Sequence, residues 1–256
     1  LAALGPASTI SDSPLTLLVF LAVATTNIVA STLKLKRPGD IQQVEGDGLS
    51  VAAGATLTGA WLSVVLGSAV GVIIWFAAEP LSAFYLVRGV ASGRENLVPL
   101  AAIYIRVRSL AMPAAILGAT AQAACLGAKD TRTPMLAVLL AAALNFGGDL
   151  LLVPSSGVFG AAVATAASQM VSTAMLCHVL TKKKLLPSIP SAFKMTAHWV
   201  QSLFTRKTTN FKMTLRAAVA PFFAFGPFVF CCCMKLLLHN SASMTTAALG
   251  GTATPA

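Results

Sequence analysis

The sequence predicts an all-α integral membrane protein, a polytopic bundle of about six transmembrane helices. Hydrophobic residues make up 56% of its 256 residues and charged residues only 10%, and the mean hydropathy is +0.80. Soluble domains carry about 25% charged residues. Several runs without Asp, Glu, Lys or Arg approach or exceed the roughly 20 apolar residues that span a hydrocarbon core. These runs are 13–33, 49–78, 109–128, 150–181 and 217–234.

The placement of the basic residues, which give a net charge of +10, argues against a nucleic-acid-binding protein, and the spacing of the five cysteines argues against a zinc-binding one. The basic residues lie between the predicted spans, not in a patch that would bind nucleic acid, so no nucleic-acid partner is expected. The cysteines lack zinc-type CxxC spacing with histidine partners, and they are interpreted as small apolar filler. We expect neither a metal site nor a cofactor.

Proline and turn residues set the borders of the predicted spans. Proline is favoured at the first position of a helix, where we expect Pro14 and Pro134, and the Glu-Pro pair at 79–80 is expected to end the second span. Pro-Ser-Ser-Gly over 154–157 is a turn. The spans cover about 14–33, 49–76, 99–126, 134–153, 158–180 and 215–238, with loops predicted over 1–12 and 79–96.

Two spans have internal features that predict their shape and packing. Pro113 lies inside the third span and should bend it, which membrane helices tolerate where neighbours satisfy the freed carbonyl. Arg106 and Arg108, near the start of that span, are expected to reach the membrane interface. Gly67 and Gly71 form a GxxxG motif in the second span, which favours close helix packing.

Loop charges predict the orientation of the bundle. The loops 34–48, 127–133 and 181–214 carry twelve Lys and Arg residues, whereas 79–98 and 154–157 carry two. Basic loops remain on the cytoplasmic side of a membrane, or its topological equivalent. The first span therefore runs from outside to inside, and the fourth from inside to outside.

The longest polar connection, 182–214, is basic and amphipathic. Phe193, Ala197, Val200 and Phe204 follow helical spacing among lysines and arginines. This pattern is typical of a helix on an anionic membrane surface, and a calmodulin-type target is the weaker alternative.

The candidate functional residues lie in the fourth span, which is otherwise apolar. Asn145 and Asp149 are four residues apart, so both side chains lie on one helix face. Asp149 is the one acidic residue that the sequence places well within a span, and an ionisable group at membrane depth indicates function by default. A low-dielectric surrounding disfavours the ionised carboxylate, so such a group can take up and release a proton. The alternative is a polar contact that only holds the helices together.

Other polar residues within the spans are candidates for lining a cavity or for packing. Thr26 and Asn27 lie in the first span, Gln122 in the third and Gln169 in the fifth. Hydrogen bonding between helices is the favoured interpretation of Thr26 and Asn27. Thr165, also in the fifth span, is predicted to complete a network with Asn145 and Asp149.

These motifs, in this order, resemble the multidrug and toxic compound extrusion (MATE) family of cation-coupled exporters, and most closely its plant and algal branch with plastid-envelope members. Phe20–Ala30 resembles the second family helix. Tyr104-Ile-Arg106, with Pro113 and Gln122 and then Gly127, Asp130, Thr133 and Pro134, resembles the fourth helix and its turn. Asn145 and Asp149 resemble the fifth helix, and Gly157–Thr165 with Gln169 resembles the sixth.

The resemblance implies two six-helix lobes around a central cavity. Residues 1–181 would form part of the N-terminal lobe, 182–214 a basic cytoplasmic loop between lobes, and 215–256 the first helix of the second lobe and the start of the next. The family's first helix, with an acidic site residue, and most of the second lobe would lie outside this sequence. The implied function is proton- or sodium-coupled antiport, by alternating access, of small organic compounds or xenobiotics across a plastid-envelope, plasma or vacuolar membrane.

Three rival functions remain open from the sequence. A lipid-linked oligosaccharide flippase of related topology should line its cavity with several basic residues. A truncated, non-transporting membrane subunit would also fit both termini, which resemble internal positions of a longer chain. An intramembrane enzyme is disfavoured because the histidines, His178, His198 and His239, are isolated and no HExxH or GxSxG motif occurs. No GxxxxGK[ST] motif supports direct use of ATP.

Overall fold

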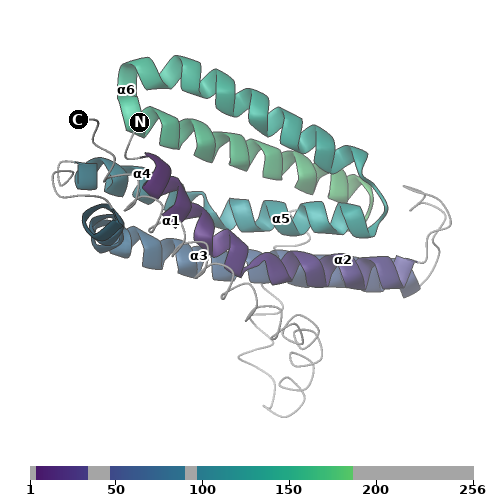
Figure 1. The fold of residues 1–256 in the computed structure, drawn as a ribbon. Helices are drawn as coiled ribbons and strands as arrows, with labels where there is room; N and C mark the ends of the chain where they lie inside the picture. Colours follow the sequence, from purple (N-terminus) through teal and green to yellow (C-terminus); the bar gives the residue numbers. More distant parts are fainter. Residues whose placement is uncertain (1–3, 34–46, 90–96, 187–256) are drawn as a thin grey trace, which may run out of the picture.

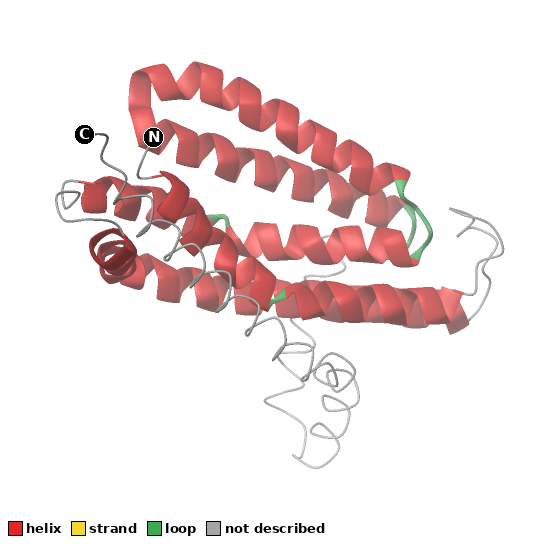
Figure 2. Ribbon diagram, in the orientation of Figure 1, coloured by secondary structure: helices red, strands yellow, loops and turns green. Residues whose placement is uncertain are grey.

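The computed structural model describes residues 4–33, 47–89 and 97–186, which form helices joined by short turns and no strand (Figures 1 and 2). The predicted all-α fold class is confirmed. The sixth predicted span and the basic amphipathic stretch lie outside the described residues. The helices are α1 (Leu4–Leu17), α2 (Val19–Leu33), α3 (Asp47–Gly89), α4 (Val98–Leu110), α5 (Met112–Gly127) and α6 (Arg132–Lys182).

The first predicted span begins earlier than expected and is interrupted. The loop predicted over 1–12 is wrong, because α1 is already helical at Leu4. Pro14 therefore lies inside a helix, not at its start, and Leu18 separates α1 from α2. The charge of Asp12 is accommodated within α1 because the Arg108 guanidinium of α4 donates a hydrogen bond to it.

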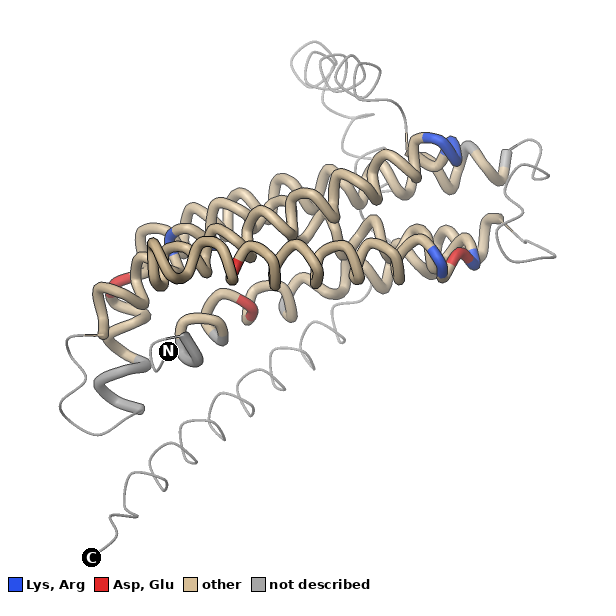
Figure 3. Tube along the Cα trace, turned by 90° about the horizontal axis from the view of Figure 1, so that it is seen from above, with Lys and Arg blue, Asp and Glu red and all other residues tan. Residues whose placement is uncertain are grey.

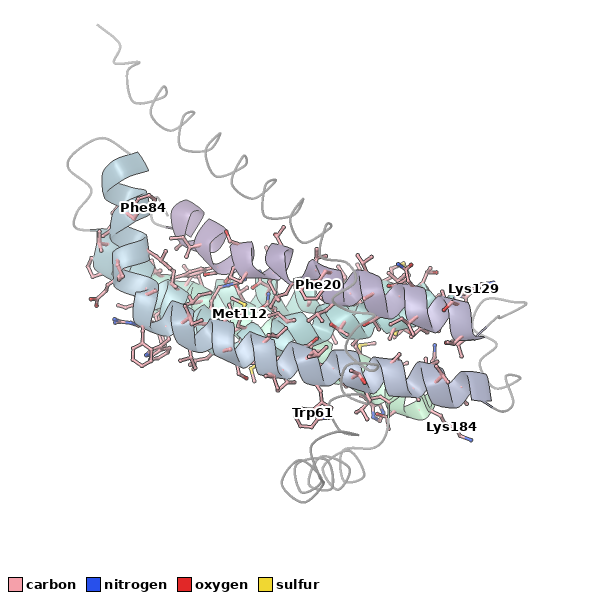
Figure 4. All side chains as sticks on the ribbon, turned by 90° about the horizontal axis from the view of Figure 1, so that it is seen from below. Phe20, Trp61, Phe84, Met112, Lys129 and Lys184 are labelled. Carbon is pink, nitrogen blue, oxygen red and sulfur yellow. The ribbon has the colours of Figure 1, made fainter. Side chains whose placement is uncertain are left out.

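Helix α3 runs past the point where it was expected to end. The 79–80 pair does not end it, since the helix continues to Gly89, and the predicted loop is wrong over 79–89. Pro80 removes one backbone hydrogen bond, but the apolar residues that follow still favour a helix at the end of the bundle. Figure 4 shows the turns that carry Phe84 bending away from the long axis of α3.

Helices α4 and α5 form one broken span, bent by 52° at Ala111. The bend predicted from Pro113 is present. The two glycines of the GxxxG motif in α3 lie against it. A Cβ on Gly67 would come within 2.8 Å of the Pro113 Cα, and one on Gly71 within 2.6 Å of the Ser109 carbonyl oxygen. Glycine is therefore needed at both positions for α3 to approach the bend.

Helix α6 is a hairpin of two arms that reverses at Gly157 (Figure 1). Gly157 has φ of 56° and ψ of −129°, a conformation that glycine adopts most readily. It lies at the end of the turn predicted over 154–157, so the fourth and fifth predicted spans correspond to the two arms. Near the open end, the Ser172 hydroxyl of the second arm donates to the Ala137 carbonyl of the first at 3.0 Å.

The first arm of α6 lies at the edge of the bundle (Figure 1). The second arm packs between it and α4 and α5, while α1, α2 and α3 form the opposite side. Buried apolar side chains form two clusters. One joins α1 and α4 to the later part of α3 and the first turns of α2 and α5, and the other lies around the far ends of α2, α5 and α6.

Candidate functional site

The candidate site lies on the first arm of α6. Asn145 and Asp149 are both partly buried, whereas the neighbouring Phe146, Leu150 and Leu151 are exposed. The polar pair therefore occupies the sheltered face of a helix whose other face is apolar and uncovered. The spacing of the two residues predicted that they share a face, and the structure shows that this face is the sheltered one.

The two side chains present acceptors without donors. The Oδ1 atoms of Asn145 and Asp149 are both buried, and neither has a hydrogen-bond partner. Among the buried side-chain nitrogen and oxygen atoms of the described residues, they are the two in this condition. A buried acceptor left without a donor costs about 1–3 kcal/mol. The pair therefore presents two oxygen acceptors, one helical turn apart, that are able to accept a hydrogen bond.

Small residues let the two arms approach closely beside this pair. A Cβ on Gly148 would lie 2.8 Å from the Ala164 Cβ, and one on Gly160 would lie 2.4 Å from the Leu152 carbonyl oxygen. The second arm therefore covers the face that carries Asp149. The small residues at the start of the second arm predicted that another helix approaches closely there. The sequence did not show where along the first arm this contact occurs.

Thr165 shares the hairpin with the pair, but its hydroxyl hydrogen is used elsewhere. It donates to the Ala161 carbonyl oxygen of its own helix at 2.9 Å. The expected hydrogen bond from Thr165 to either unsatisfied Oδ1 atom is not formed, because a threonine in a helix readily bonds to the carbonyl four residues earlier. The predicted three-residue network is therefore incomplete in this structure.

The remaining polar candidates are distributed over the bundle. The Thr26 hydroxyl lies 3.1 Å from the carbonyl oxygens of both Ala22 and Ala123, so it joins α2 to α5. This contact is the interhelical packing that was favoured for it. Asn27 is exposed, and Gln122 and Gln169 are partly buried.

Two ion pairs of α4 were missed by the sequence interpretation. Arg106 donates to Glu79 of α3 at 2.9 Å, and Arg108 donates to Asp12 of α1 at 2.5 Å. Arg108 is 7% exposed, so the expectation that it reaches the interface is wrong. The signal was present, since two carboxylates and two guanidiniums occur in helical segments with little other charge. Their pairing across 27 and 96 residues was not apparent.

A third ion pair closes the open end of the α6 hairpin. Asp130 precedes α6 and pairs with Lys183, which follows it, and the Thr133 amide also donates to Asp130 at 3.2 Å. Burial alone would raise the pKa of Asp130, but the hydrogen bonds from Lys183 and Thr133 outweigh it and hold the pKa below its ordinary value. Figure 3 shows Lys and Arg gathered at this end, where Figure 4 labels Lys129 and Lys184.

Comparison with known sequences gives two kinds of match. A family model described as lipid II flippase MurJ matches residues 52–223. Protein DETOXIFICATION 47, chloroplastic, of Arabidopsis thaliana is 34% identical over 187 residues, which cover 72% of this chain and 31% of that protein. Protein DETOXIFICATION 43 of the same plant is 30% identical over 201 residues, covering 75% and 37%. The chain thus spans about a third of the length of these curated relatives.

Solved structures with the same fold are MATE transporters. One described as a multidrug resistance MATE family transporter of the MOP superfamily, facing inward, has a TM-score of 0.59 at 23% identity and covers 70% of this chain and 38% of its own. A MATE transporter in the bent conformation has a TM-score of 0.60 at 18% identity, covering 98% and 60%. The chain is an integral membrane protein. The MurJ model matches more than half of this chain, so the chain belongs to the family that this model describes. The curated relatives and the solved structures agree with the resemblance to MATE proteins that the motifs predicted.

Proposed function

We propose that this protein is a cation-coupled antiporter that exports small organic compounds by alternating access, with Asp149 as the coupling carboxylate. The observation that carries the proposal is the pair of buried Oδ1 atoms without donors on Asn145 and Asp149. A proton bound by Asp149 supplies the hydrogen that the Asn145 Oδ1 atom lacks. Release of that proton leaves both buried acceptors without a donor, which favours a rearrangement of the hairpin.

The composition of the site favours a proton over sodium as the coupling ion. Sodium is a hard cation held by several oxygen ligands, as calcium and magnesium are. Two side-chain oxygens are without a partner at this site, and the hydroxyl hydrogen of Thr165 is committed to Ala161. Within the part of the chain that the structure describes, no group of three His, Cys, Asp or Glu residues could hold a metal ion. A proton needs only one acceptor beyond the carboxylate that carries it.

The flippase alternative has support from the MurJ family model. Such a protein needs free positive charge in its cavity to bind an anionic lipid head group. Arg106 and Arg108 are the basic residues within the broken third span, and each is neutralised by a carboxylate of a neighbouring helix. The ion pairs therefore favour export of organic compounds over the flipping of an anionic lipid.

The test is transport by the intact protein in proteoliposomes, with ethidium as a fluorescent organic cation and an imposed proton or sodium gradient. Asp149→Asn is expected to lose gradient-driven transport, and Asp149→Glu, which keeps the carboxyl group, to retain part of it. Ser155→Ala, on the exposed turn of the hairpin, is the matched control and should transport normally. Normal transport by correctly folded Asp149→Asn would remove the coupling role. Movement of a labelled lipid-linked oligosaccharide, without ethidium transport, would favour the flippase.

The membrane that holds the protein is proposed from one relative. DETOXIFICATION 47 carries the description chloroplastic, which favours the plastid envelope over the plasma or vacuolar membrane. Localisation of a fluorescent fusion in plant or algal cells decides between them.

A further inference from the structure

We propose that the open end of the α6 hairpin binds the phosphate of an anionic lipid head group through Arg132, Lys182 and Lys184. We call these three residues the hairpin cations. Arg132 begins α6, Lys182 ends it and Lys184 follows two residues later, so all three lie at the end of the bundle where Figure 3 shows Lys and Arg. The proposal concerns the membrane surface and does not depend on the transport role of Asp149.

The hairpin cations are exposed and have no internal partner. None of the three side chains forms a hydrogen bond or an ion pair with another residue that the structure describes. Within residues 97–186 the carboxylates are Asp130 and Asp149. Asp130 is buried and pairs with Lys183, and Asp149 lies toward the closed end of the hairpin. Neither carboxylate is therefore available to the hairpin cations.

The arginines of α4, which lie toward the opposite end of the bundle, do have carboxylate partners. Arg106 pairs with Glu79 and Arg108 with Asp12. Among the side chains that the structure describes, positive charge without a carboxylate partner therefore lies at the open end of α6, where it attracts anions from the surroundings. The loop charges predict that this end lies on the cytoplasmic side or its equivalent, the side on which anionic lipids give the membrane a negative surface potential.

Lys184 occupies a backbone position that favours glycine. Its φ is 58°, in the left-handed region, where a residue with a Cβ is strained. The conformation is fixed by the next residue, because the Leu185 amide donates to the Leu180 carbonyl at 3.0 Å and both leucine side chains are fully buried. A charged residue retained at a strained position indicates that the charge has a use. The simpler use is a favourable interaction with the helix C-terminus, and the test below separates it from lipid binding.

The surface next to the hairpin cations is apolar and exposed, which is what the acyl chains of a lipid require. Met135 and Leu136 lie one turn from Arg132 and are 56% and 51% exposed, and Leu126 at the end of α5 is 48% exposed. The open end thus offers cations to a phosphate at the level of the helix ends, and apolar side chains to the acyl chains one turn deeper. A soluble anion would use the cations alone, so the adjoining apolar surface favours a lipid.

The test is binding of phosphatidylglycerol to the intact protein in uncharged detergent micelles, measured by native mass spectrometry beside an equal concentration of phosphatidylcholine. The wild type should prefer phosphatidylglycerol by about tenfold or more. Arg132→Gln and Lys182→Gln should each lower the affinity for phosphatidylglycerol about fivefold, the effect of one cation near an anionic surface. Arg106→Gln also removes one cation, but toward the opposite end, and is the matched control that should leave this affinity unchanged. Equal retention of the two lipids by the wild type, or an equal loss in Arg106→Gln, would overturn the proposal.

Lys184→Gly separates lipid binding from stabilisation of the helix end. It should raise the thermal midpoint measured without anionic lipid, because glycine relieves the strain, and it should lower the affinity for phosphatidylglycerol about fivefold. A lower midpoint with unchanged affinity would show that the lysine only stabilises the helix, and would overturn the proposal. The triple variant Arg132→Gln/Lys182→Gln/Lys184→Gly changes exposed side chains alone, so it should fold and show no preference for phosphatidylglycerol through this surface.

Inorganic phosphate and glycerol 3-phosphate distinguish a free anion from a lipid head group. At the concentration at which phosphatidylglycerol raises the thermal midpoint of the wild type, neither soluble anion should raise it. An equal rise with either of them would make the open end a site for a soluble phosphate, and the assignment to a lipid would be wrong.

Discussion

Removing the Asp130 carboxylate tests what closes the α6 hairpin that carries Asp149. One oxygen of Asp130 accepts the Thr133 amide at 3.2 Å, and the other pairs with Lys183. Both partners are sheltered from water, since the Asp130 and Lys183 side chains are 9% and 26% exposed. The hairpin is therefore held at its open end by one carboxylate with two tasks.

The two interactions of Asp130 make separate contributions to the free energy of unfolding. A helix cap contributes about 0.5–2 kcal/mol, and a hydrogen bond to a charged group about 1.5–3 kcal/mol. Asp130→Ala loses both, so we expect a loss of about 2–4 kcal/mol in the free energy of unfolding. Asp130→Asn keeps an acceptor for the Thr133 amide, and about half of that loss is expected.

Unfolding in mixed micelles with increasing denaturant measures these differences. Lys183→Met removes the ion pair and keeps the hydrogen bond from the Thr133 amide, so its loss of unfolding free energy should match that of Asp130→Asn. The double variant Asp130→Asn/Lys183→Met should lose less than the sum of the two single losses. Because the pKa of Asp130 is held below its ordinary value, its contribution is complete above the unfolded value of about 3.9 and is lost as the pH falls through the lower folded value. Losses below about 0.5 kcal/mol for Asp130→Ala, or a contribution that vanishes near neutral pH, would refute this account of the hairpin.

Three further predictions concern the hairpin itself. Gly148→Ala should destabilise the protein by about 1–3 kcal/mol because its Cβ meets Ala164, whereas a Cβ at Gly147 meets nothing within 4 Å and Gly147→Ala should be neutral or stabilising; equal unfolding midpoints would contradict this. Gly157→Ala should cost about 1–3 kcal/mol by strain at φ of 56° and lower the thermal midpoint, and an unchanged midpoint would be evidence against the reversal. Asn145→Leu should raise the free energy of unfolding by about 1 kcal/mol, since it removes an unsatisfied acceptor, yet reduce ethidium transport; a destabilised but fully active variant would argue against the role of Asn145.

Hydropathy and proline positions predicted much of this fold, because membrane-spanning helices must satisfy their backbone internally and need long apolar runs. The bend at Pro113 and the reversal at Gly157 both follow from local backbone chemistry. The wrong helix ends also come from applying local backbone chemistry alone. Pro80 was expected to end a helix, but in this bundle its missing hydrogen bond is tolerated and α3 continues.

The sequence did not predict which side chains interact between helices. The i to i+4 spacing predicted that Asn145 and Asp149 share a face, and the structure places them on the sheltered one. The partners of Arg106 and Arg108 depend on how α1, α3 and α4 pack, which no local pattern encodes. Thr165 was expected to bond across the hairpin, but the carbonyl of its own helix is always within reach and competes successfully.

The most direct measurement of the central claim is infrared difference spectroscopy of the intact protein in lipid, recorded between two values of pH and between potassium and sodium salts. It observes the carboxyl group itself and requires no transported substrate. If Asp149 is the coupling group, the wild-type spectrum contains a carboxyl band that changes when a proton or sodium ion is supplied and that is missing from Asp149→Asn. Identical difference spectra from the wild type and from folded Asp149→Asn would contradict the account.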